Sequence, residues 1–514
     1  MTGVQTCALP ISTHIHDILG VGIGPFGLGL AALSEPLDDV DAIFLDQRPE
    51  FRWHPGMMIE GSTIQVPFLA DLVTMADPTS PYSFLNFLKE RRRLYPFYIR
   101  ESFYPLRAEF DEYCRWVTAQ LDTLRWNRRV VSVTREEGVF TALAEVADDS
   151  GSIVTTETYL ARHLVLGVGT QPVLPPALQG LGGDAGADTS GAGPDGVAEP
   201  DGVAGSPAAG PLIHTADYLE NREALLDSGA ITIVGSGQSA AEIYRDLIDD
   251  AEDRGIRLDW VTRSPRFFPM EYTKLTLEMT SPEYTDHFLA LPDELRERVG
   301  REQRNLYKGI SADLVDDIHD TLYRLSRCGR QLLTNLISEA ELETADIDPI
   351  SGEYLLGFRN TALGKTFTRR SGSVVAATGY KSQVPDFLSP LGDDIRLDSR
   401  GRLDVSRHYT INDEGTIHVV GGEEHTHGVT APDLGFGPWR ASVVLAAVTG
   451  REPYPIERTI AFQTFGVPAD ESDVSALATA NSAAGDSRTA SADADSGAHS
   501  AAFVLDDSKE MSHA

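Results

Sequence analysis

The chain has 514 residues, enough for two or three domains, and its 41% share of hydrophobic residues is that of an ordinary globular protein. Its 77 acidic side chains outnumber 43 basic ones, and the formal net charge of -34 argues against binding to nucleic acid or to an anionic membrane surface. No apolar run reaches the roughly 18 residues of a membrane span, and three cysteines cannot form a disulfide framework, so we expect a cytoplasmic protein.

Three stretches lack the pattern of a folded domain. Residues 1–12 precede the first patterned strand and look like a sequencing artefact rather than native sequence. Residues 178–210 are rich in Gly, Ala, Asp and Pro, and the tail at 468–514 is similarly acidic. Such segments cannot bury enough apolar surface to offset their ordering entropy, so we expect both to be disordered.

The first patterned element is a strand at 17–21 that leads into a glycine-rich turn. Gly22, Gly24 and Gly27 have the spacing in which one glycine makes the tight turn, one lets the backbone approach a pyrophosphate, and one lets helix and strand pack closely. The following strand ends at Asp46, whose carboxylate can accept hydrogen bonds from ribose hydroxyls. The pattern predicts an adenine dinucleotide site, and the alternative is a glycine-rich turn without a ligand.

A second strand, turn and helix of the same kind begins with a strand at 231–234. Gly235 and Gly237 are followed by Ala240 at the third glycine position, and the next strand ends with Arg263 in place of an acid. An acid there would repel a 2′-phosphate, whereas an arginine pairs with it. We therefore predict NADP(H) rather than NAD(H) at this turn.

The two turns, one followed by an acid and one by an arginine, imply FAD and NADPH in one chain. The predicted fold class is α/β, with two Rossmann-like dinucleotide-binding domains and a small substrate-binding region. We place the FAD-binding domain at 13–177 and 371–467, and the NADPH-binding domain with substrate-contacting segments at 211–370. Buried strands at 374–380 and 417–422 are expected to complete the FAD-binding domain.

Seven segments resemble the siderophore-type N-hydroxylating flavin monooxygenases, the family of ornithine and lysine N-hydroxylases and their diamine-specific relatives. The similarity runs from about His16 to Pro455 and is carried by VGIGPFGLGLAAL, FRWHPGMMIEG, QVPFLADLVTMADPTSPYSFLNFL, FYPLRAEFDEYCRW, VGSGQSAAEIYRDL, ATGY and HTHGVTAPDLGFGPWR. It implies that reduced flavin traps dioxygen as a C4a-hydroperoxide and that a neutral primary amine attacks the terminal oxygen. It also implies NADPH as reductant, an amine and O2 as substrates, and a homo-oligomer, either a dimer or a tetramer.

The resemblance implies roles for individual residues. FAD would be bound by Gly22, Gly24, Gly27 and Asp46, with Trp53, His54 and Gln65 along the flavin. NADPH would be held by Gly235, Gly237, Gln238, Ser239 and Arg263. Further cofactor contacts would come from Thr378, Gly379, Tyr380 and Leu434. Gln65 and Asn305 would be catalytic, and the substrate would lie against Gln65, Ala70, Leu277, Glu278, Asn305 and Gly435.

The substrate-contacting segments depart from those of the amino-acid hydroxylases in this family. Those enzymes carry a lysine in FLKDLV that contacts the substrate carboxylate, whereas this chain has Ala70 in FLADLV. Two further carboxylate contacts correspond to Gly435 and Leu277. Losing a buried charge partner costs about 3–5 kcal/mol, so we predict a diamine, cadaverine or putrescine, hydroxylated for a hydroxamate siderophore. Glu278 is a candidate partner for the distal ammonium and equally a surface or structural glutamate.

Several alternatives remain open at this point. L-lysine, and then L-ornithine, are the rival substrates within the same chemistry. A disulfide reductase with two dinucleotide sites is disfavoured because the chain has no redox CxxC, and a flavin-binding protein without turnover is the alternative from another class.

The segment Glu423–His427 resembles a metal cluster by composition. His425 and His427 share a face only in extended chain, and the resemblance places them near the flavin, so we predict no metal site. His14 and His16 are expected to be surface residues.

Overall fold

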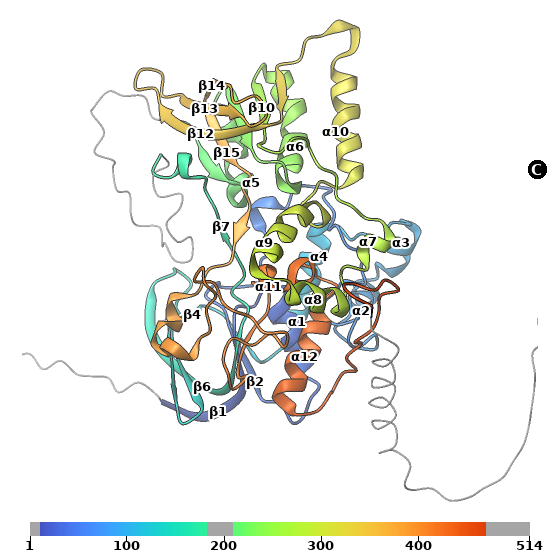
Figure 1. Cartoon of the computed structure of the whole chain (residues 1–514), viewed down its shortest axis with the longest axis vertical. Coiled ribbons are helices and arrows are strands. Elements are labelled where there is room, and N and C mark those ends of the chain that lie inside the picture. The colour runs from blue at the N-terminus through green and yellow to red at the C-terminus, as the bar shows by residue number, and fades with distance from the viewer. Residues whose placement is uncertain (1–10, 182–208, 469–514) are drawn as a thin grey trace, which may run out of the picture. The chain divides into compact units, whose positions relative to one another are not determined.

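The computed structural model describes residues 11–181 and 209–468 (Figure 1). The disorder expected at 178–210 and 468–514 falls almost entirely outside these residues, as does most of the stretch at 1–12. The chain divides after Gln463 into two units, and the first contains every helix and strand that the structure describes. No helix in the described ranges is long and apolar enough to cross a membrane.

The first sheet has seven strands in the order β3-β2-β1-β6-β5-β4, with β17 also paired to β6. They are β1 (Ile11–Val21), β2 (Ala42–Leu45), β3 (Leu124–Arg125), β4 (Arg128–Glu136), β5 (Val139–Ala147), β6 (Ile153–Leu166) and β17 (Ile417–Val419). β1 pairs in parallel with β2 and β6, whereas β4, β5 and β6 are antiparallel neighbours. β1 is longer than the predicted 17–21 because its first half pairs with the long β6, and it includes two of the residues set aside as an artefact.

Both faces of β1 are buried. Ile18 points into a core with three helices, and Leu19 points into a second core with β4, β5 and a 3-10 helix. The helices on the first face are α1 (Pro25–Ser34), α4 (Arg107–Thr118) and α12 (Gly437–Thr449), and the 3-10 helix on the other is η6 (Asp386–Asp394). Burial on both faces applies to the second half of the strand, residues 18–21, which is also its apolar part.

The second sheet has five parallel strands in the order β11-β10-β9-β15-β8. They are β8 (Leu212–His214), β9 (Ala230–Val234), β10 (Arg257–Val261), β11 (Thr334–Ile337) and β15 (Ser373–Ala376). The prediction that the strand near 374 completes the FAD-binding domain is therefore wrong, because β15 pairs with β8 and β9 of this sheet. The second domain extends beyond its predicted end at 370.

Two different layers cover the second sheet. One core contains apolar residues of three helices, α5 (Tyr218–Leu226), α6 (Gln238–Arg254) and α10 (Ala312–Leu325). The other contains residues of a three-stranded antiparallel sheet, β12 (Ala340–Ile347), β13 (Tyr354–Asn360) and β14 (Thr366–Ser371), which the sequence analysis did not anticipate. Figure 1 shows this small sheet beside β10 and β15.

The chain passes between the two large sheets twice, and the two passages pair with each other. β7 (Gln171–Pro172) leads away from β6, and β16 (Tyr380–Lys381) leads back from β15. The two segments form an antiparallel ribbon in which Gln171 faces Lys381. The Thr378 hydroxyl donates to the carbonyl of Val173 at 2.5 Å. This ribbon places the carboxyl ends of β6 and β15 close to one another.

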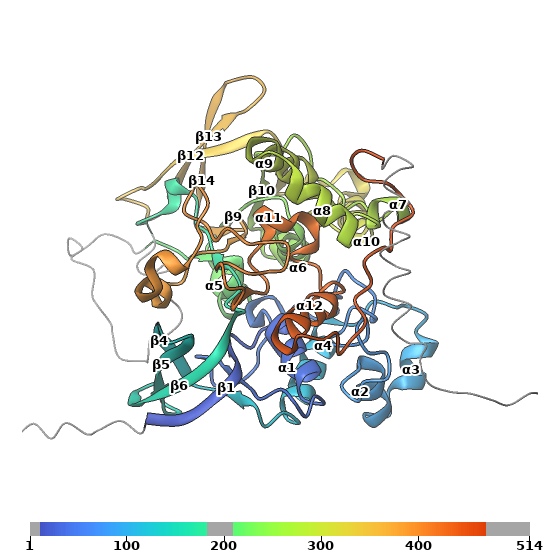
Figure 2. The same ribbon diagram turned by 60° about the horizontal axis from the view of Figure 1, so that its bottom comes forward.

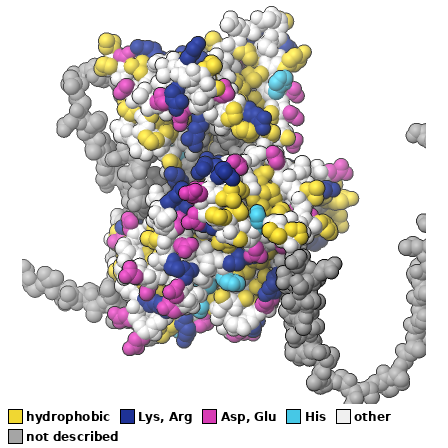
Figure 3. All heavy atoms as spheres, in the orientation of Figure 1, with side chains coloured by type: hydrophobic (Ala, Val, Ile, Leu, Met, Phe, Trp, Pro, Cys, Tyr) yellow, Lys and Arg dark blue, Asp and Glu magenta, His cyan; other side chains and the backbone are white. Residues whose placement is uncertain are grey.

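Short helices fill the space around these sheets. They are α2 (Phe84–Glu90), α3 (Leu94–Ile99), α7 (Lys274–Leu277), α8 (Pro282–Ala290), α9 (Asp293–Glu302), α11 (Glu424–His427) and the 3-10 helices η1 (Pro55–Met57), η2 (Pro176–Leu178), η3 (Thr215–Asp217), η4 (Gln303–Leu306), η5 (Arg327–Gly329) and η7 (Gly428–Thr430). α11 packs against α8 and α9 (Figure 2). On the face drawn in Figure 3, acidic and basic side chains are interspersed.

Candidate cofactor and substrate site

The first glycine turn, between β1 and α1, has an open backbone at one position and close packing at the other two. Gly22 has φ +99°, and a Cβ there would collide with the carbonyl of Gly167 at the end of β6. A Cβ on Gly27 would collide with the carbonyl of Gly22. A Cβ on Gly24 would meet no atom within 4 Å. The turn can therefore bring a phosphate close to the backbone at Gly24 and to the free N–H groups at the start of α1.

Asp46 lies directly after β2 and is tied to the same turn. Its Oδ2 accepts from the backbone N–H of Ile23 at 2.8 Å. Arg48 donates to Oδ1 from its backbone N at 2.9 Å and its Nε at 3.0 Å, and to Oδ2 from Nη2 at 2.8 Å. These four bonds fill the acceptor positions of the carboxylate. A ribose hydroxyl can bind there when it replaces the Arg48 guanidinium.

The second glycine turn, between β9 and α6, has the same design. Gly235 has φ +136°, and a Cβ there would collide with the carbonyl of Ala377. A Cβ on Gly237 would meet only the Lys308 carbonyl, at 3.5 Å. Ser239 lies in the first turn of α6, whose N-terminal N–H groups are available to a phosphate. Arg263 follows β10 and is exposed, and no acid in the described ranges pairs with its guanidinium. The arginine is therefore free to bind a 2′-phosphate.

A buried ion pair connects the second turn to the first domain. Arg107 of α4 donates to Glu242 of α6 through two bonds of 2.7 and 2.9 Å, and both side chains are almost fully buried. Gln238, the first residue of α6, donates to Glu242 at 2.9 Å and accepts from the backbone N of Ser311 at 2.8 Å. We call Arg107, Glu242 and Gln238 the interdomain clamp. The sequence analysis missed the pair because Arg107 and Glu242 are 135 residues apart.

Trp53 and His54, two predicted flavin residues, belong to a series of aromatic ring contacts. Trp53 packs on Phe110 with ring centroids 4.9 Å apart and on His54 at 5.3 Å. His54 also meets Tyr380 at 6.2 Å, and Tyr380 meets His214 at 4.9 Å. Desolvation, and then the charges of two nearby arginines, lower the pKa of His54 to about 4. His54 is therefore neutral at physiological pH and offers a flat, uncharged surface.

The connection between β15 and β16 lies next to these aromatic residues. The carbonyl of Gly379 accepts from His214 Nε2 and from the backbone N of Val173, both at 3.1 Å. The three predicted cofactor residues Thr378, Gly379 and Tyr380 are thus fixed against the ribbon that joins the two sheets.

Two of the predicted substrate residues lie side by side. A Cβ on Gly435 would be 3.4 Å from the Cβ of Ala70 and 3.1 Å from Oδ1 of Asp433. A small cavity of about 10 Å³, partly open to solvent, lies between Ala70 and the start of α1. It is lined by Pro25, Phe26, Gly29, Ala70, Asp71, Leu72, Phe110, Leu434, Gly437 and Pro438. The structure therefore brings Ala70, Gly435 and Leu434 together beside the first glycine turn.

Tyr272 connects Gln65 to the same region. Its hydroxyl donates to the carbonyl of Gln65 at 2.5 Å. Burial raises the pKa of Tyr272, and the negative charge of Asp433 raises it further. Asn305 lies beside this segment, because its Nδ2 donates to the carboxylate of Glu271 at 2.8 Å. Gln65 and Asn305, predicted as catalytic, thus flank Tyr272, which the sequence analysis did not single out.

Glu278 has a different environment from the one predicted for a substrate residue. It caps the short, exposed helix α7, and its Oε2 accepts from Gln463 N at 3.0 Å and Nε2 at 2.9 Å. In the described ranges no hydrogen bond links Glu278 to Gln65, Ala70 or Gly435. Leu277 beside it is exposed. The structure supports the alternative of a structural glutamate, because the Gln463 contacts account for the Glu278 carboxylate.

The histidines near the C-terminal strand are not arranged as metal ligands. The segment is helix α11, in which residues two apart do not share a face. His425 donates to the carbonyl of Leu403 at 2.8 Å, and His427 stacks on Tyr409 with ring centroids 4.5 Å apart. Their separate packing partners point the two imidazoles to different neighbours.

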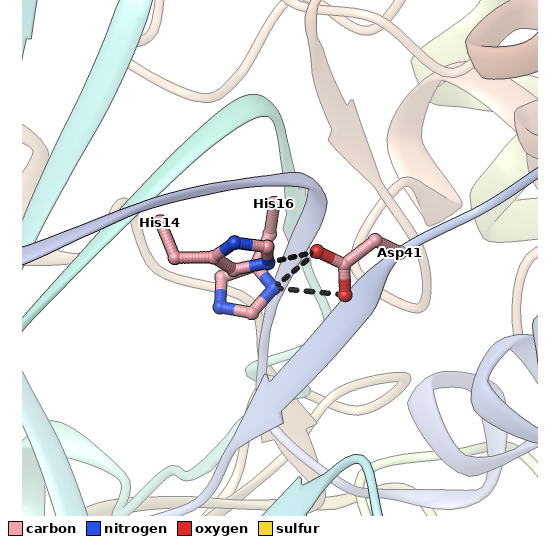
Figure 4. Close-up of side chains that lie close together, drawn as sticks. All are labelled: His14, His16 and Asp41. Carbon is pink, nitrogen blue, oxygen red and sulfur yellow. Dashed lines mark hydrogen bonds and ion pairs between the residues drawn. The ribbon is translucent and has the colours of Figure 1, made fainter.

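A cluster of two histidines and one acid lies at the other end of β1, and Figure 4 shows it. His14 and His16 lie on one face of the strand, and both approach the carboxylate of Asp41, His16 at 3.0 Å. Their ligand atoms lie within 4.8 Å of one another. His14 is exposed, as predicted, whereas His16 is mostly buried. The cluster lies at the start of the strand, whereas the glycine turn follows its end, so it belongs to neither dinucleotide site.

Two sheets, each with a glycine turn and a helix N-terminus at the carboxyl end of a central parallel strand, define a flavoprotein with a second site for a nicotinamide dinucleotide. The family model described as L-lysine 6-monooxygenase/L-ornithine 5-monooxygenase matches residues 14–192 and 200–382. The chain belongs to this family.

The similar proteins give the same family with high coverage. A putrescine N-hydroxylase of Shewanella oneidensis is 44% identical over 88% of this chain and 85% of that protein. A putrescine N-hydroxylase of Acinetobacter baumannii is 39% identical over 90% of this chain and 96% of that protein. The crystal structure of an FAD-bound cadaverine monooxygenase of the desferrioxamine pathway of Erwinia amylovora has a TM-score of 0.81 and 42% identity, and covers 89% of this chain and 100% of that one. The predicted fold class and the predicted class of flavin-dependent N-monooxygenase are confirmed.

Proposed function

We propose that the protein hydroxylates one terminal amine of a diamine, putrescine or cadaverine, with FAD and NADPH as cofactors and O2 as co-substrate, for a hydroxamate siderophore. The relatives described above act on putrescine or cadaverine, as their names say. The oligomeric state and the cytoplasmic location expected from the sequence stay predictions.

One observation supports the choice of a diamine. Where the amino-acid hydroxylases are expected to hold a substrate carboxylate, this chain has the methyl group of Ala70 facing the bare backbone of Gly435. The charged atom that a Cβ on Gly435 would meet is itself a carboxylate oxygen, Oδ1 of Asp433, at 3.1 Å. A carboxylate-bearing substrate would find no cation there and would be repelled by the acid. A diamine carries no carboxylate and avoids both penalties.

The residues present fit the two cofactors. The open backbone at Gly24 and the N-terminus of α1 fit a pyrophosphate, with Asp46 at the ribose after Arg48 moves away. The open backbone at Gly237 and the unpaired Arg263 fit NADPH. When bound, NADPH supplies a hydride and FAD activates dioxygen.

The chain's own residues position the amine and keep water out. Trp53 and neutral His54 present uncharged rings between the two turns. Gln65 and Asn305 are linked to the same segment, because the Tyr272 hydroxyl donates to the Gln65 carbonyl and Asn305 Nδ2 donates to Glu271. Their side-chain amides offer hydrogen-bonding groups for the reacting amine. A poorly hydrated pocket lowers the pKa of an amine from about 10, so that its neutral, nucleophilic form is available.

The test is hydroxylamine formation with cadaverine, putrescine, L-lysine and L-ornithine measured side by side. NADPH oxidation alone is insufficient, because it also reports peroxide released without hydroxylation. A diamine preferred by about tenfold or more, or 1.4 kcal/mol, is the expected result. A preference for lysine or ornithine would overturn the diamine assignment and leave the flavin chemistry intact. A yellow protein that forms no hydroxylamine from any amine would overturn the monooxygenase assignment.

A further inference from the structure

The proposed diamine leaves one end of the substrate without an assigned partner. A diamine that presents one neutral amine for oxidation still carries a distal ammonium, because its ordinary pKa is near 10. A buried ammonium needs a carboxylate or several hydrogen-bond acceptors. Glu278, the candidate from the sequence, already accepts two hydrogen bonds from Gln463. The structure presents a different carboxylate, that of Asp433.

Asp433 lies in the loop between η7 and α12, beside Gly435 and Ala70. Its Oδ1 accepts from the backbone N of Phe436 at 3.0 Å, which fixes the side chain at the entrance to α12. Oδ1 also lies 3.1 Å from the position of a Cβ on Gly435. Gly435 and Ala70 bring no polar or bulky side chain against this carboxylate, and a Cβ on Gly435 would already be in tight contact with it.

The Asp433 carboxylate lacks a countercharge. Burial raises its pKa, and the backbone hydrogen bonds from Phe436 and Gly435 only partly oppose that rise. No arginine, lysine or histidine in the described ranges forms an ion pair with it. The nearest cation that influences it is Arg440, which is committed to an ion pair with Glu423 at 3.0 Å and donates to the carbonyls of Thr430 and Ala431. Asp433 is half-buried, and an ammonium bound beside its carboxylate would supply the missing countercharge.

Asp433 also lies near Tyr272, which contacts the predicted substrate residue Gln65. Its charge acts on Tyr272, and the Tyr272 hydroxyl donates to the carbonyl of Gln65. Tyr272 therefore connects Asp433 to Gln65. Ala70 and Gly435 lie next to Asp433. An extended diamine placed with its reacting amine near Gln65 has its other end at this carboxylate.

We propose that Asp433 binds the distal ammonium of the diamine substrate and selects diamines over monoamines and amino acids. The inference rests on the proposed function, because it requires a substrate with a second amine. The same carboxylate that attracts an ammonium repels the α-carboxylate of lysine or ornithine. One residue thus supplies both the attraction to the correct substrate and the repulsion of the wrong one.

The experiment compares Asp433→Asn with the wild-type holoenzyme on putrescine, cadaverine and their monoamine counterparts n-butylamine and n-pentylamine. Asn retains an oxygen acceptor for Phe436 N, so the loop is preserved. We expect the KM for the diamine to rise about 30-fold or more, with monoamine hydroxylation and flavin reduction by NADPH unchanged. Asp39→Asn, which removes an acid from an exposed ion pair with Arg451, is the matched control.

A second variant tests the geometry. Asp433→Glu keeps the charge and extends it by one methylene, so the preferred diamine should become shorter by about one carbon, with a higher ratio of putrescine to cadaverine turnover. An unchanged diamine KM in Asp433→Asn, or equal losses with diamines and monoamines, would overturn the inference. An increase in KM confined to Glu278→Gln would also overturn it. If the wild-type enzyme hydroxylates no diamine at all, the proposed function itself fails, and this outcome is distinct from the others.

Discussion

The glycine turns at 22–27 and 235–240 share their backbone geometry and differ in the charge that follows the next strand. In each turn the first glycine has a positive φ, and a neighbouring carbonyl occupies the place of its missing side chain. After the first turn, Asp46 folds back and accepts from Ile23 N. After the second, Arg263 extends into solvent with no acid of the described chain paired to it. The backbone of each turn suits a pyrophosphate, and the following residue distinguishes a ribose diol from a 2′-phosphate.

The two turns also differ in how they are anchored. The helix of the second turn is tied to the first domain by the interdomain clamp, which contains a fully formed Arg–Glu pair. The clamp holds Gln238 at the start of that helix. The position of the second turn therefore depends on the first domain.

The largest effect is expected from breaking the clamp. Arg107→Leu leaves Glu242 buried without its partner, which should lower the free energy of unfolding by about 3–5 kcal/mol. It should also weaken NADPH binding more than flavin binding, because Gln238 loses its anchor. Denaturant unfolding and NADPH titration measure these changes. The double variant Arg107→Leu/Glu242→Leu should recover most of the stability, and a double variant as unstable as the single one would contradict this account.

The second prediction separates the two turns. Gly24 and Gly237 are N-cap residues with ordinary extended backbone, φ −77° and −84°, and a Cβ fits at both. Gly24→Ala should weaken FAD binding by about 100-fold, or 2.7 kcal/mol, because the methyl group occupies the approach of the pyrophosphate. Gly237→Ala should retain flavin but be reduced slowly by NADPH and normally by dithionite. Flavin content and stopped-flow reduction test the pair, and loss of flavin in both variants would show that the turns are not independent.

The third prediction concerns the charge after the second turn. Arg263→Ala should raise the KM for NADPH by about 10- to 100-fold, because a charge-assisted bond to the 2′-phosphate is worth about 1.5–3 kcal/mol. The KM for NADH should change little. Arg266→Ala, which removes a nearby arginine that stacks on Phe268, is the matched control. Equal increases in KM for NADH and NADPH would show that Arg263 does not act through the 2′-phosphate.

The smallest effect is a stability change at Asp433. Burial raises the pKa of this carboxyl above its ordinary 3.8, so the folded protein binds its proton more tightly than the unfolded chain. The carboxylate therefore costs stability above its folded pKa, and the cost falls as the pH decreases toward 3.8. Asp433→Asn should have a higher Tm than wild type at pH 8, and the difference should shrink as the pH falls toward 3.8. A lower Tm for the variant at pH 8 would indicate that the carboxylate is already paired.

Local patterns accounted for the parts of the molecule that depend on neighbours in the sequence. Gly22, Gly24 and Gly27 form their turn because the spacing itself encodes it, and Asp46 and Arg263 follow at the ends of the next strands. β15 was assigned to the wrong sheet because a short apolar run does not indicate which strands will flank it. β2 of the first sheet and β9 and β15 of the second are buried at every residue, so the burial pattern of β15 does not indicate which sheet it joins.

Long-range partners were beyond a single sequence. Arg107 and Glu242 lie in motifs that the resemblance had already selected, yet nothing local indicates that they pair across 135 residues. The sequence pointed to Glu278 and gave no sign of Asp433, because nothing local distinguishes one single acid near a substrate segment from another. The packing of Gly435 against Ala70 shows that Asp433 lies beside these two predicted substrate residues.

The paired passages between the two sheets have a consequence for how such a chain could have been assembled. Everything between Gln171 and Lys381, including the whole second sheet, enters and leaves the first domain at two positions that face each other in one ribbon. Adjacent ends are the condition under which a domain can be excised or exchanged without rearranging its host. A gene segment encoding the second domain could therefore be replaced by one of different nicotinamide preference while the first sheet keeps its strand order.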